Sequence, residues 1–161
     1  MKRLNLPNLT LMALTGSALI MSGAQLFAVS IIASTVSKAP PRSFAIFSGE
    51  YAYDSRAFWD VVPTIVFVLF LAALLANWRT PRRNYVLSAL GLFVLSGLIA
   101  FLYLEPTFDA MIAQGFSDHV DPVMQRNAAT WYMVDWASWG VLFAASITLL
   151  VALAQPPKGD G

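Results

Sequence analysis

Apolar and polar positions alternate along this chain in whole segments rather than residue by residue. Long apolar runs cover about residues 9–36, 56–78, 84–104 and 122–154, and shorter polar stretches separate them. A helix needs about 20 predominantly apolar residues to cross the hydrocarbon core of a bilayer. The pattern therefore predicts an all-α membrane protein with four transmembrane helices in a single domain, residues 1–161.

Proline-containing dipeptides predict where the apolar runs end. Pro40-Pro41 follows the first run, Thr80-Pro81 separates the second from the third, and Glu105-Pro106 is expected to end the third. Proline stops a helix because it lacks the backbone N–H and its ring clashes with the preceding turn.

Two of the helix starts also carry signals. Ser55 is a candidate N-cap for the second helix, while Pro63 lies inside that run and is expected to bend it. Asp121 followed by Pro122 is a strong start signal, with the acid as cap and proline at the first helical position. The fourth helix is then more than 30 residues long, or about 50 Å at 1.5 Å per residue, and extends beyond the lipid.

The first run invites comparison with a secretory signal. Lys2 and Arg3 precede it, and Ser22-Gly23-Ala24 resembles a cleavage site. The apolar run nevertheless continues through Ile32, far past a usual signal core, which favours a retained span.

The basic residues predict the orientation. They cluster at the two termini and in the tight second loop, at Lys2, Arg3, Arg79, Arg82, Arg83 and Lys158, whereas the two longer loops mix basic with acidic residues. Because cytoplasmic loops are enriched in Lys and Arg, we expect both termini in the cytoplasm and the longer loops outside. The expected fold is an up-down-up-down four-helix bundle with two extracytoplasmic loops, residues 37–60 and 105–127, in the inner membrane of a bacterium.

Small residues predict how the helices pack. Gly16 and Gly23 are seven positions apart and share one face of the first helix. Close packing at small residues drives helix association in lipid, so this face is expected to meet another helix of the bundle or, alternatively, a partner chain.

Composition narrows the chemistry. The chain is 58% hydrophobic and 12% charged, with net charge +1, no cysteine and one histidine. These values fit a lipid-bilayer environment and give no sign of a nucleic-acid partner, a thiolate metal site or a three-histidine zinc site. His119 lies near Asp118 and Asp121, but a solvated loop with capping acids explains them better than a metal site. We expect no metal and no cofactor.

Asp135 is the residue most suggestive of chemistry. An acid at membrane depth is costly unless it is paired or hydrated, and is by default a candidate functional residue. Asn127, Trp131 and Trp139 precede and follow it at four-residue spacing, so the four roughly share a face. Either they form an outward-opening substrate pocket with Asp135 as the catalytic residue, or Asp135 lies at the interface, hydrated or paired with Arg56 or Arg126.

Two further residues are expected at comparable depth. Gln25, in the outer half of the first helix, is predicted to hydrogen-bond Asp135 or Tyr103. Such a contact is either structural or part of a substrate-binding pocket that includes Tyr103.

The layout resembles that of the anthrone-oxygenase-like family of small four-helix membrane proteins. The resemblance covers nearly the whole chain and rests on the Gly-rich segment 16–27, an outer loop with an aromatic segment, Asn77-Trp78-Arg79 followed by Arg82-Arg83, Glu105-Pro106, and a Trp-bearing start to the last helix. It implies a cofactor-independent oxygenase of aromatic polyketides, or a relative that has lost this activity.

The sequence departs from that family at two positions. Members often have Asn four residues after the tryptophan that aligns with Trp131, and Arg three residues further on. Here those positions are Asp135 and Ser138, which puts a substrate-binding role for them in doubt.

Three functions are compatible with these features. The first is a non-catalytic four-helix membrane protein, alone or as an accessory or structural subunit with a membrane-protein partner or as a homo-oligomer. The second is an oxygenase-like oxidoreductase with a pocket near Asp135. The third is a lipid or small-molecule carrier that uses the same pocket.

Overall fold

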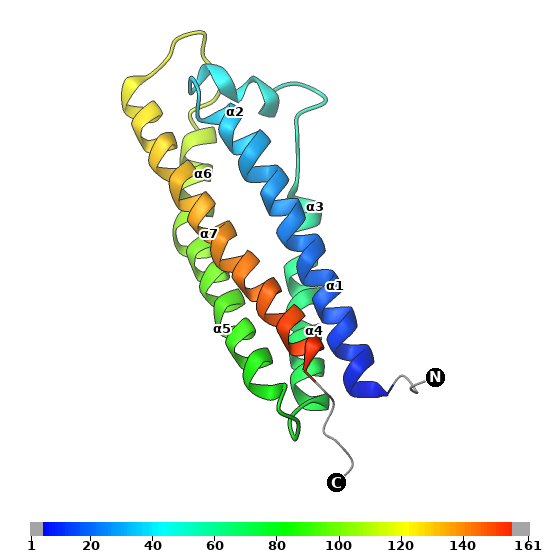
Figure 1. The fold of residues 1–161 in the computed structure, drawn as a ribbon. Coiled ribbons are helices and arrows are strands. Elements are labelled where there is room, and N and C mark those ends of the chain that lie inside the picture. The colour runs from blue at the N-terminus through cyan, green and yellow to red at the C-terminus, as the bar shows by residue number, and fades with distance from the viewer. Residues whose placement is uncertain (1–4, 156–161) are drawn as a thin grey trace.

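The computed structural model describes residues 5–155, and within them the secondary structure is helical apart from one isolated bridge between Pro41 and Val120. Four helical runs are long and apolar enough to cross a membrane: Leu6–Val36, Arg56–Ala76, Arg83–Ile112 and Pro122–Ala154. This confirms the prediction of an all-helical chain with four such helices. The runs lie side by side, and the chain reverses direction between one run and the next (Figure 1).

Three of the runs are composite. The first consists of α1 (Leu6–Phe27), the π-helix η1 (Ala28–Ala33) and α2 (Ser34–Val36). The second consists of α3 (Arg56–Trp59) and α4 (Val62–Ala76). The third consists of α5 (Arg83–Ile99), the π-helix η3 (Ala100–Leu104) and α6 (Glu105–Ile112), whereas the fourth is the single helix α7 (Pro122–Ala154).

Two proline predictions require correction. Pro63 does not bend a continuous helix; it occupies the first turn of α4, after a break at residues 60–61. Glu105-Pro106 does not end the third run, because Pro106 lies in the first turn of α6, directly after η3. A first-turn proline loses no intrahelical hydrogen bond, so both prolines are accommodated at junctions between helical segments.

The helix starts were predicted more accurately. Asp121 caps α7, with its carboxylate accepting the backbone N–H groups of Val123 and Met124 at 2.7 and 3.3 Å. Ser55 is the N-cap residue of α3, but its side chain makes no capping hydrogen bond. Asp54 instead accepts the backbone N–H of Arg56 at 2.9 Å.

The end of the bundle that carries the α4–α5 turn, here called the turn end, is held by buried polar side chains. Arg82 is 4% exposed and donates from Nε and Nη2 to the carbonyl oxygen of Gln155, and from Nη1 to the side chain of Asn8. Asn77 is fully buried and donates to the carbonyl oxygen of Pro7 at 3.2 Å. These contacts fix the turn ends of all four runs at one level.

The runs differ in length, so the opposite end, here called the loop end, is uneven. The second run has 21 residues, and the others have 31, 30 and 33. Since the turn ends are level, α7 exceeds the second run by 33 − 21 = 12 residues, or about 18 Å at 1.5 Å per residue. In Figure 1, α3 accordingly starts well short of α2, α6 and the beginning of α7.

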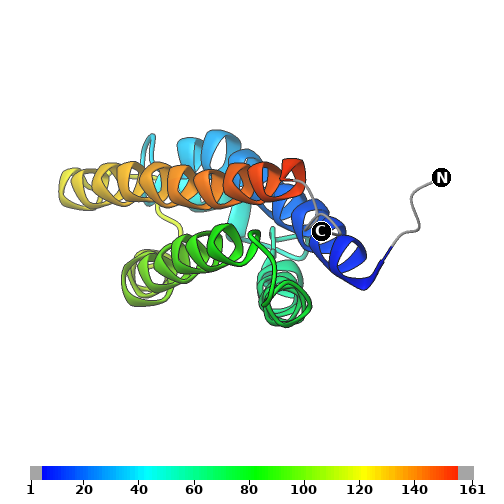
Figure 2. The same cartoon turned by 60° about the horizontal axis from the view of Figure 1, so that its bottom comes forward.

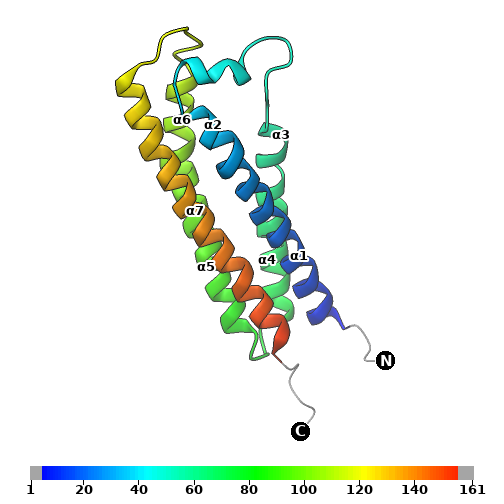
Figure 3. The ribbon, with the colours of Figure 1, turned by 45° about the horizontal axis from the view of Figure 1, so that its top comes forward.

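Beyond the start of α3 the remaining helices form a head with its own apolar core. The 3₁₀-helix η2 (Arg42–Phe47) lies across it, as Figure 3 shows. Polar contacts close the head: Asp121 N donates to the Pro40 carbonyl at 3.0 Å, and Gln125 Nε2 donates to the Lys38 carbonyl at 2.9 Å.

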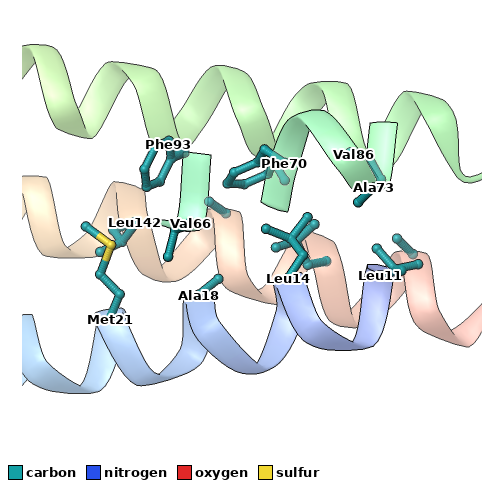
Figure 4. Packing of buried hydrophobic residues seen from close by; sticks show 14 residues of the cluster. Leu11, Leu14, Ala18, Met21, Val66, Phe70, Ala73, Val86, Phe93 and Leu142 are labelled. Atoms are coloured by element: carbon teal, nitrogen blue, oxygen red, sulfur yellow. The ribbon is translucent and has the colours of Figure 1, made fainter. Parts of the chain in front are cut away.

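Two apolar clusters therefore occupy the bundle. The turn-end cluster joins α1, α4, α5 and α7, and Figure 4 shows Phe70 and Phe93 facing Leu14 and Leu142 within it. The loop-end cluster lies in the head and includes Val36, Phe44, Leu104, Met111, Met124 and Trp131. Figure 2, in which the turn end comes forward, shows the arrangement of α1, α4, α5 and α7, the helices whose residues make up the first cluster.

The prediction that the face with Gly16 and Gly23 packs against another helix of the bundle was wrong. Gly16 and Gly23 are exposed, and no atom of another segment lies within 4 Å of the position that a Cβ would occupy at either residue. Residues on other faces of α1, such as Leu14, Ala18 and Ser22, make the contacts with the bundle instead. The alternative, a partner chain against this face, stays open.

Candidate functional site

A layer of polar side chains separates the two apolar clusters. We call it the polar layer; its members are Ser22, Gln25, Ser96, Asp135 and Ser138. Along each helix these residues fall between the last residue of one cluster and the first of the other, as between Met21 and Ala33 on the first run. All except Asp135 are buried, and Asp135 is partly buried.

Asp135 contacts the first helical run, as the sequence predicted. Gln25 Nε2 donates to Asp135 Oδ1 across 3.4 Å, and Gln25 is 9% exposed. This distance is longer than the 2.7–3.2 Å that is common for N–H···O hydrogen bonds, so the hydrogen bond is weak. The carboxylate is therefore held against an amide rather than against Arg56 or Arg126. Arg126 is nine positions earlier on the same helix, on its opposite side.

Ser138 connects three helices within the polar layer. Its Oγ lies 3.0 Å from Ser96 Oγ, Ser96 Oγ also donates to the Ser138 carbonyl at 3.2 Å, and Gln25 Nε2 lies 3.5 Å from Ser138 Oγ. Ser138 is 1% exposed, so its hydroxyl is enclosed by protein. Neither Ser96 nor Ser138 was among the predicted site residues.

Trp139 extends the layer to the backbone of α1. Its indole Nε1 donates to the carbonyl oxygen of Ser22 at 3.2 Å. The ring stacks on Phe143 at 5.3 Å between centroids and meets the edge of Trp136 at 5.4 Å. An indole held in this way is fixed in orientation and packs the helices together.

Trp131 belongs to the head rather than to the polar layer. Its Nε1 donates to the Leu104 carbonyl at 3.0 Å, and its ring stacks on Phe108 with centroids 5.4 Å apart. That carbonyl belongs to η3, where the π-helical hydrogen-bonding pattern is changing to that of α6. Trp131 therefore supports the backbone at the point where the third run changes its winding.

The predicted common face of α7 does not exist. Each four-residue step turns an α-helix by about 40° beyond a full revolution, so three steps separate Asn127 from Trp139 by about 120°. Asn127 is exposed and, with Tyr103, lines a different hollow of 450 Å³ between the third run and α7. The five predicted binding residues therefore divide between the polar layer (Gln25, Trp139), the head core (Trp131) and this hollow (Asn127, Tyr103).

A second cavity of 420 Å³ lies in the head. Phe44, Phe47 and Ser48 line it from η2 and its C-cap, Arg56 from the start of α3, and Asp109 and Phe116 from α6 and the segment after it. Gly115, also on its wall, has a φ of 74°, which suits glycine and reverses the chain after α6. Neither this cavity nor the 450 Å³ hollow is lined by Trp131, Asp135 or Trp139.

Two π-helical segments, η1 and η3, begin within a few residues of the polar layer. η1 starts three residues after Gln25 and η3 four residues after Ser96. π-helical turns are rare and frequently mark functional sites. Here they occur near the level at which α3 begins, where the four-helix packing gives way to the three helical segments of the head. Single-sequence patterns carry no clear signal for such turns.

The structure also bears on metal binding. Within residues 5–155 no group of three or more His, Asp or Glu side chains is placed to hold a metal ion. His119 is exposed and its backbone N–H donates to Ser117 Oγ at 3.3 Å.

Comparison with known proteins gives no relative. No family model matches the chain, and neither a curated protein nor a solved structure matches it. The resemblance to the anthrone-oxygenase-like family therefore stays a prediction from the sequence features alone.

Proposed function

We propose that this protein is a non-catalytic accessory or structural subunit of a membrane complex. One observation carries the proposal: four of the six residues predicted to form a pocket contact neighbouring helices with their polar groups instead. Gln25 contacts Asp135, Trp131 donates to the η3 backbone, and Trp139 donates to the α1 backbone. In lipid, such interhelical hydrogen bonds hold helices together.

The outward glycines support a partner. Gly16 and Gly23 face outward on α1, with the exposed apolar side chains of Leu19 and Ile20 between them. Gly91 and Gly97 are similarly exposed on α5. Small residues let the backbones of two membrane helices approach closely. A partner helix, or a second copy of this chain, can therefore pack against α1 at these glycines.

The proposed placement has both termini and the 79–83 turn in the cytoplasm, with the head outside the inner membrane of a bacterium. The basic residues of that turn, with Lys2, Arg3 and Lys158, support it through the positive-inside rule. Those last three residues lie outside the described part of the chain.

The test is purification of the full chain in mild detergent from its native membrane, followed by native mass spectrometry. A partner or second copy at fixed stoichiometry is expected, and Gly16→Leu with Gly23→Leu should release it while leaving the melting temperature of this chain nearly unchanged. The matched control replaces Ala137 and Ala144 by leucine, since both are exposed and lie seven positions apart on α7. A monomer in native membrane extracts contradicts the proposal.

A second candidate is the oxygenase-like enzyme, and the carboxylate of Asp135 favours it. This acid is only partly buried, and its one hydrogen bond, to Gln25, is long. The test measures oxygen consumption with an anthrone substrate for the wild type and for Asp135→Asn. Turnover that is lost in the variant, at unchanged melting temperature, supports the enzyme; the absence of turnover in the wild type counts against it.

A further inference from the structure

The 420 Å³ cavity of the head lies where a fourth helix would stand if the second run were as long as the others. Arg56 is the first residue of the second run and Ile112 the last residue of the third, and both line the cavity. Phe44 and Phe47 of η2, the helix that lies across the head, also line it. The cavity is therefore bounded by the ends of two membrane-spanning runs and by the structure that covers them.

This position is at the depth of lipid headgroups. The second run of 21 residues is about 31 Å long, close to the roughly 30 Å of a bilayer's hydrocarbon core. Its loop end, where Arg56 lies, therefore falls at the boundary between hydrocarbon and headgroups. A ligand in the cavity can enter from the membrane surface beside α3.

The wall carries one charged side chain of each sign. Arg56 supplies a guanidinium from the start of α3, and Asp109 supplies a carboxylate from α6. Guanidinium groups bind phosphate through paired, charge-assisted hydrogen bonds. A carboxylate attracts an ammonium group, and the carbonyl end of the α6 helix, on which Asp109, Ile112 and Ala113 lie, also favours a positive charge.

The aromatic rings add to this complementarity. Phe47 and Phe116 line the same cavity, and Phe116 is 49% exposed. The faces of aromatic rings attract alkylated ammonium groups. A volume of 420 Å³ also lies within the roughly 300–1,000 Å³ that is usual for small-molecule sites.

We infer that this cavity binds the headgroup of a zwitterionic phospholipid, with the phosphate at Arg56 and the ammonium group at Asp109 between the phenylalanine rings. The acyl chains then extend into the bilayer beside α3 and α4. The inference goes beyond the subunit role and does not depend on it, since it concerns a different surface.

The experiment uses the full chain in detergent, with phosphatidylcholine, phosphatidylethanolamine and phosphatidylglycerol of identical acyl chains added in equal amounts. Native mass spectrometry is expected to show one zwitterionic lipid retained per chain in preference to phosphatidylglycerol. Arg56→Gln should weaken retention of all three about tenfold, which corresponds to one lost charge-assisted contact. Asp109→Asn should remove the preference for the zwitterionic lipids.

Two exposed charges outside the cavity serve as matched controls. Arg42→Gln and Glu50→Gln should retain lipid as the wild type does. Equal retention in Arg56→Gln and Arg42→Gln overturns the inference, and so does an Asp109→Asn variant that keeps the wild-type preference. Displacement of the lipid by an equal concentration of soluble glycerophosphocholine also overturns it. Because Arg56 and Asp109 are exposed, unchanged melting temperatures are expected for both variants.

Discussion

Arg82 and Gln155 meet at the turn end, where the guanidinium donates from Nε and Nη2 to one carbonyl oxygen at 3.2 and 2.7 Å. Gln155 is the C-cap residue of α7, so the cation lies at the negative end of a long helix. Arg82 is also 4% exposed and reaches the Asn8 side chain. One arginine therefore ties the start of the first run, the central turn and the end of the last run together.

Arg82→Gln is expected to destabilise the protein by about 2–4 kcal/mol, because it removes a buried charge and leaves acceptors unpaired. Thermal unfolding in detergent measures this as a lower melting temperature. Arg79→Gln is the matched control, since Arg79 is exposed in the same turn. Similar melting temperatures for the two variants would show that the Arg82 contacts add little stability.

The contact between Gln25 and Asp135 is expected to be structural. Gln25→Leu and Asp135→Ala, alone and together, form a double-mutant cycle, because each substitution removes one partner of the contact. The coupling energy is expected to be about 0.5–1 kcal/mol, in the range of polar contacts between membrane helices. A coupling near zero would mean that the 3.4 Å contact contributes nothing, and Asp135 would then be a hydrated interfacial acid.

The helical fold followed from the sequence because its main determinant is local. An uninterrupted apolar segment of sufficient length identifies a membrane-spanning helix without any knowledge of its neighbours. The same locality explains why Asp121 was recognised as a cap: its partners Val123 and Met124 are two and three residues away.

The candidate site could be predicted from the sequence only in part, because its residues depend on which face of each helix points inward. The sequence predicted Asp135 or Tyr103 as the partner of Gln25, since all three were placed at similar depth, and the contact is with Asp135. It did not predict Ser138 as the residue that joins three helices, or the separation of Asn127 from Trp139. The π-helical segments shift the facing residues within the first and third runs, so a fixed α-helical period assigns the faces beyond them incorrectly.

Asp121→Ala is expected to destabilise the start of α7 locally. The substitution removes the acceptor for two backbone N–H groups, at a cost of about 0.5–2 kcal/mol. Hydrogen–deuterium exchange should become faster at residues 123–126 and stay unchanged at residues 145–152. Asp118→Ala, which alters a nearby exposed acid, is the control. Unchanged exchange at residues 123–126 would contradict a capping role.

The orientation can be tested directly because the chain has no cysteine. Single cysteines replace Asn84, in the first turn of the third run, and Gln114, two residues beyond the end of that run; both residues are exposed. In intact spheroplasts a membrane-impermeant maleimide should label Gln114→Cys and leave Asn84→Cys unlabelled until the cells are lysed. The reverse pattern would place the termini and the arginine-rich turn outside.

The unequal lengths of the runs predict how far the head stands out of the membrane. With the turn ends level, the residue of α7 opposite Arg56 is near position 154 − 20 = 134. Ala129 and Ala144 are both exposed on α7, on either side of that level, and about 22 Å apart at 1.5 Å per residue.

Each of these two alanines is replaced by a spin-labelled cysteine, and the protein is placed in liposomes. The accessibility of the label to a water-soluble nickel complex and to oxygen is then measured. The label at Ala129→Cys should favour the nickel complex and that at Ala144→Cys should favour oxygen. Oxygen preference at both positions would place the head in lipid, and the cavity at Arg56 would then lie too deep for a headgroup.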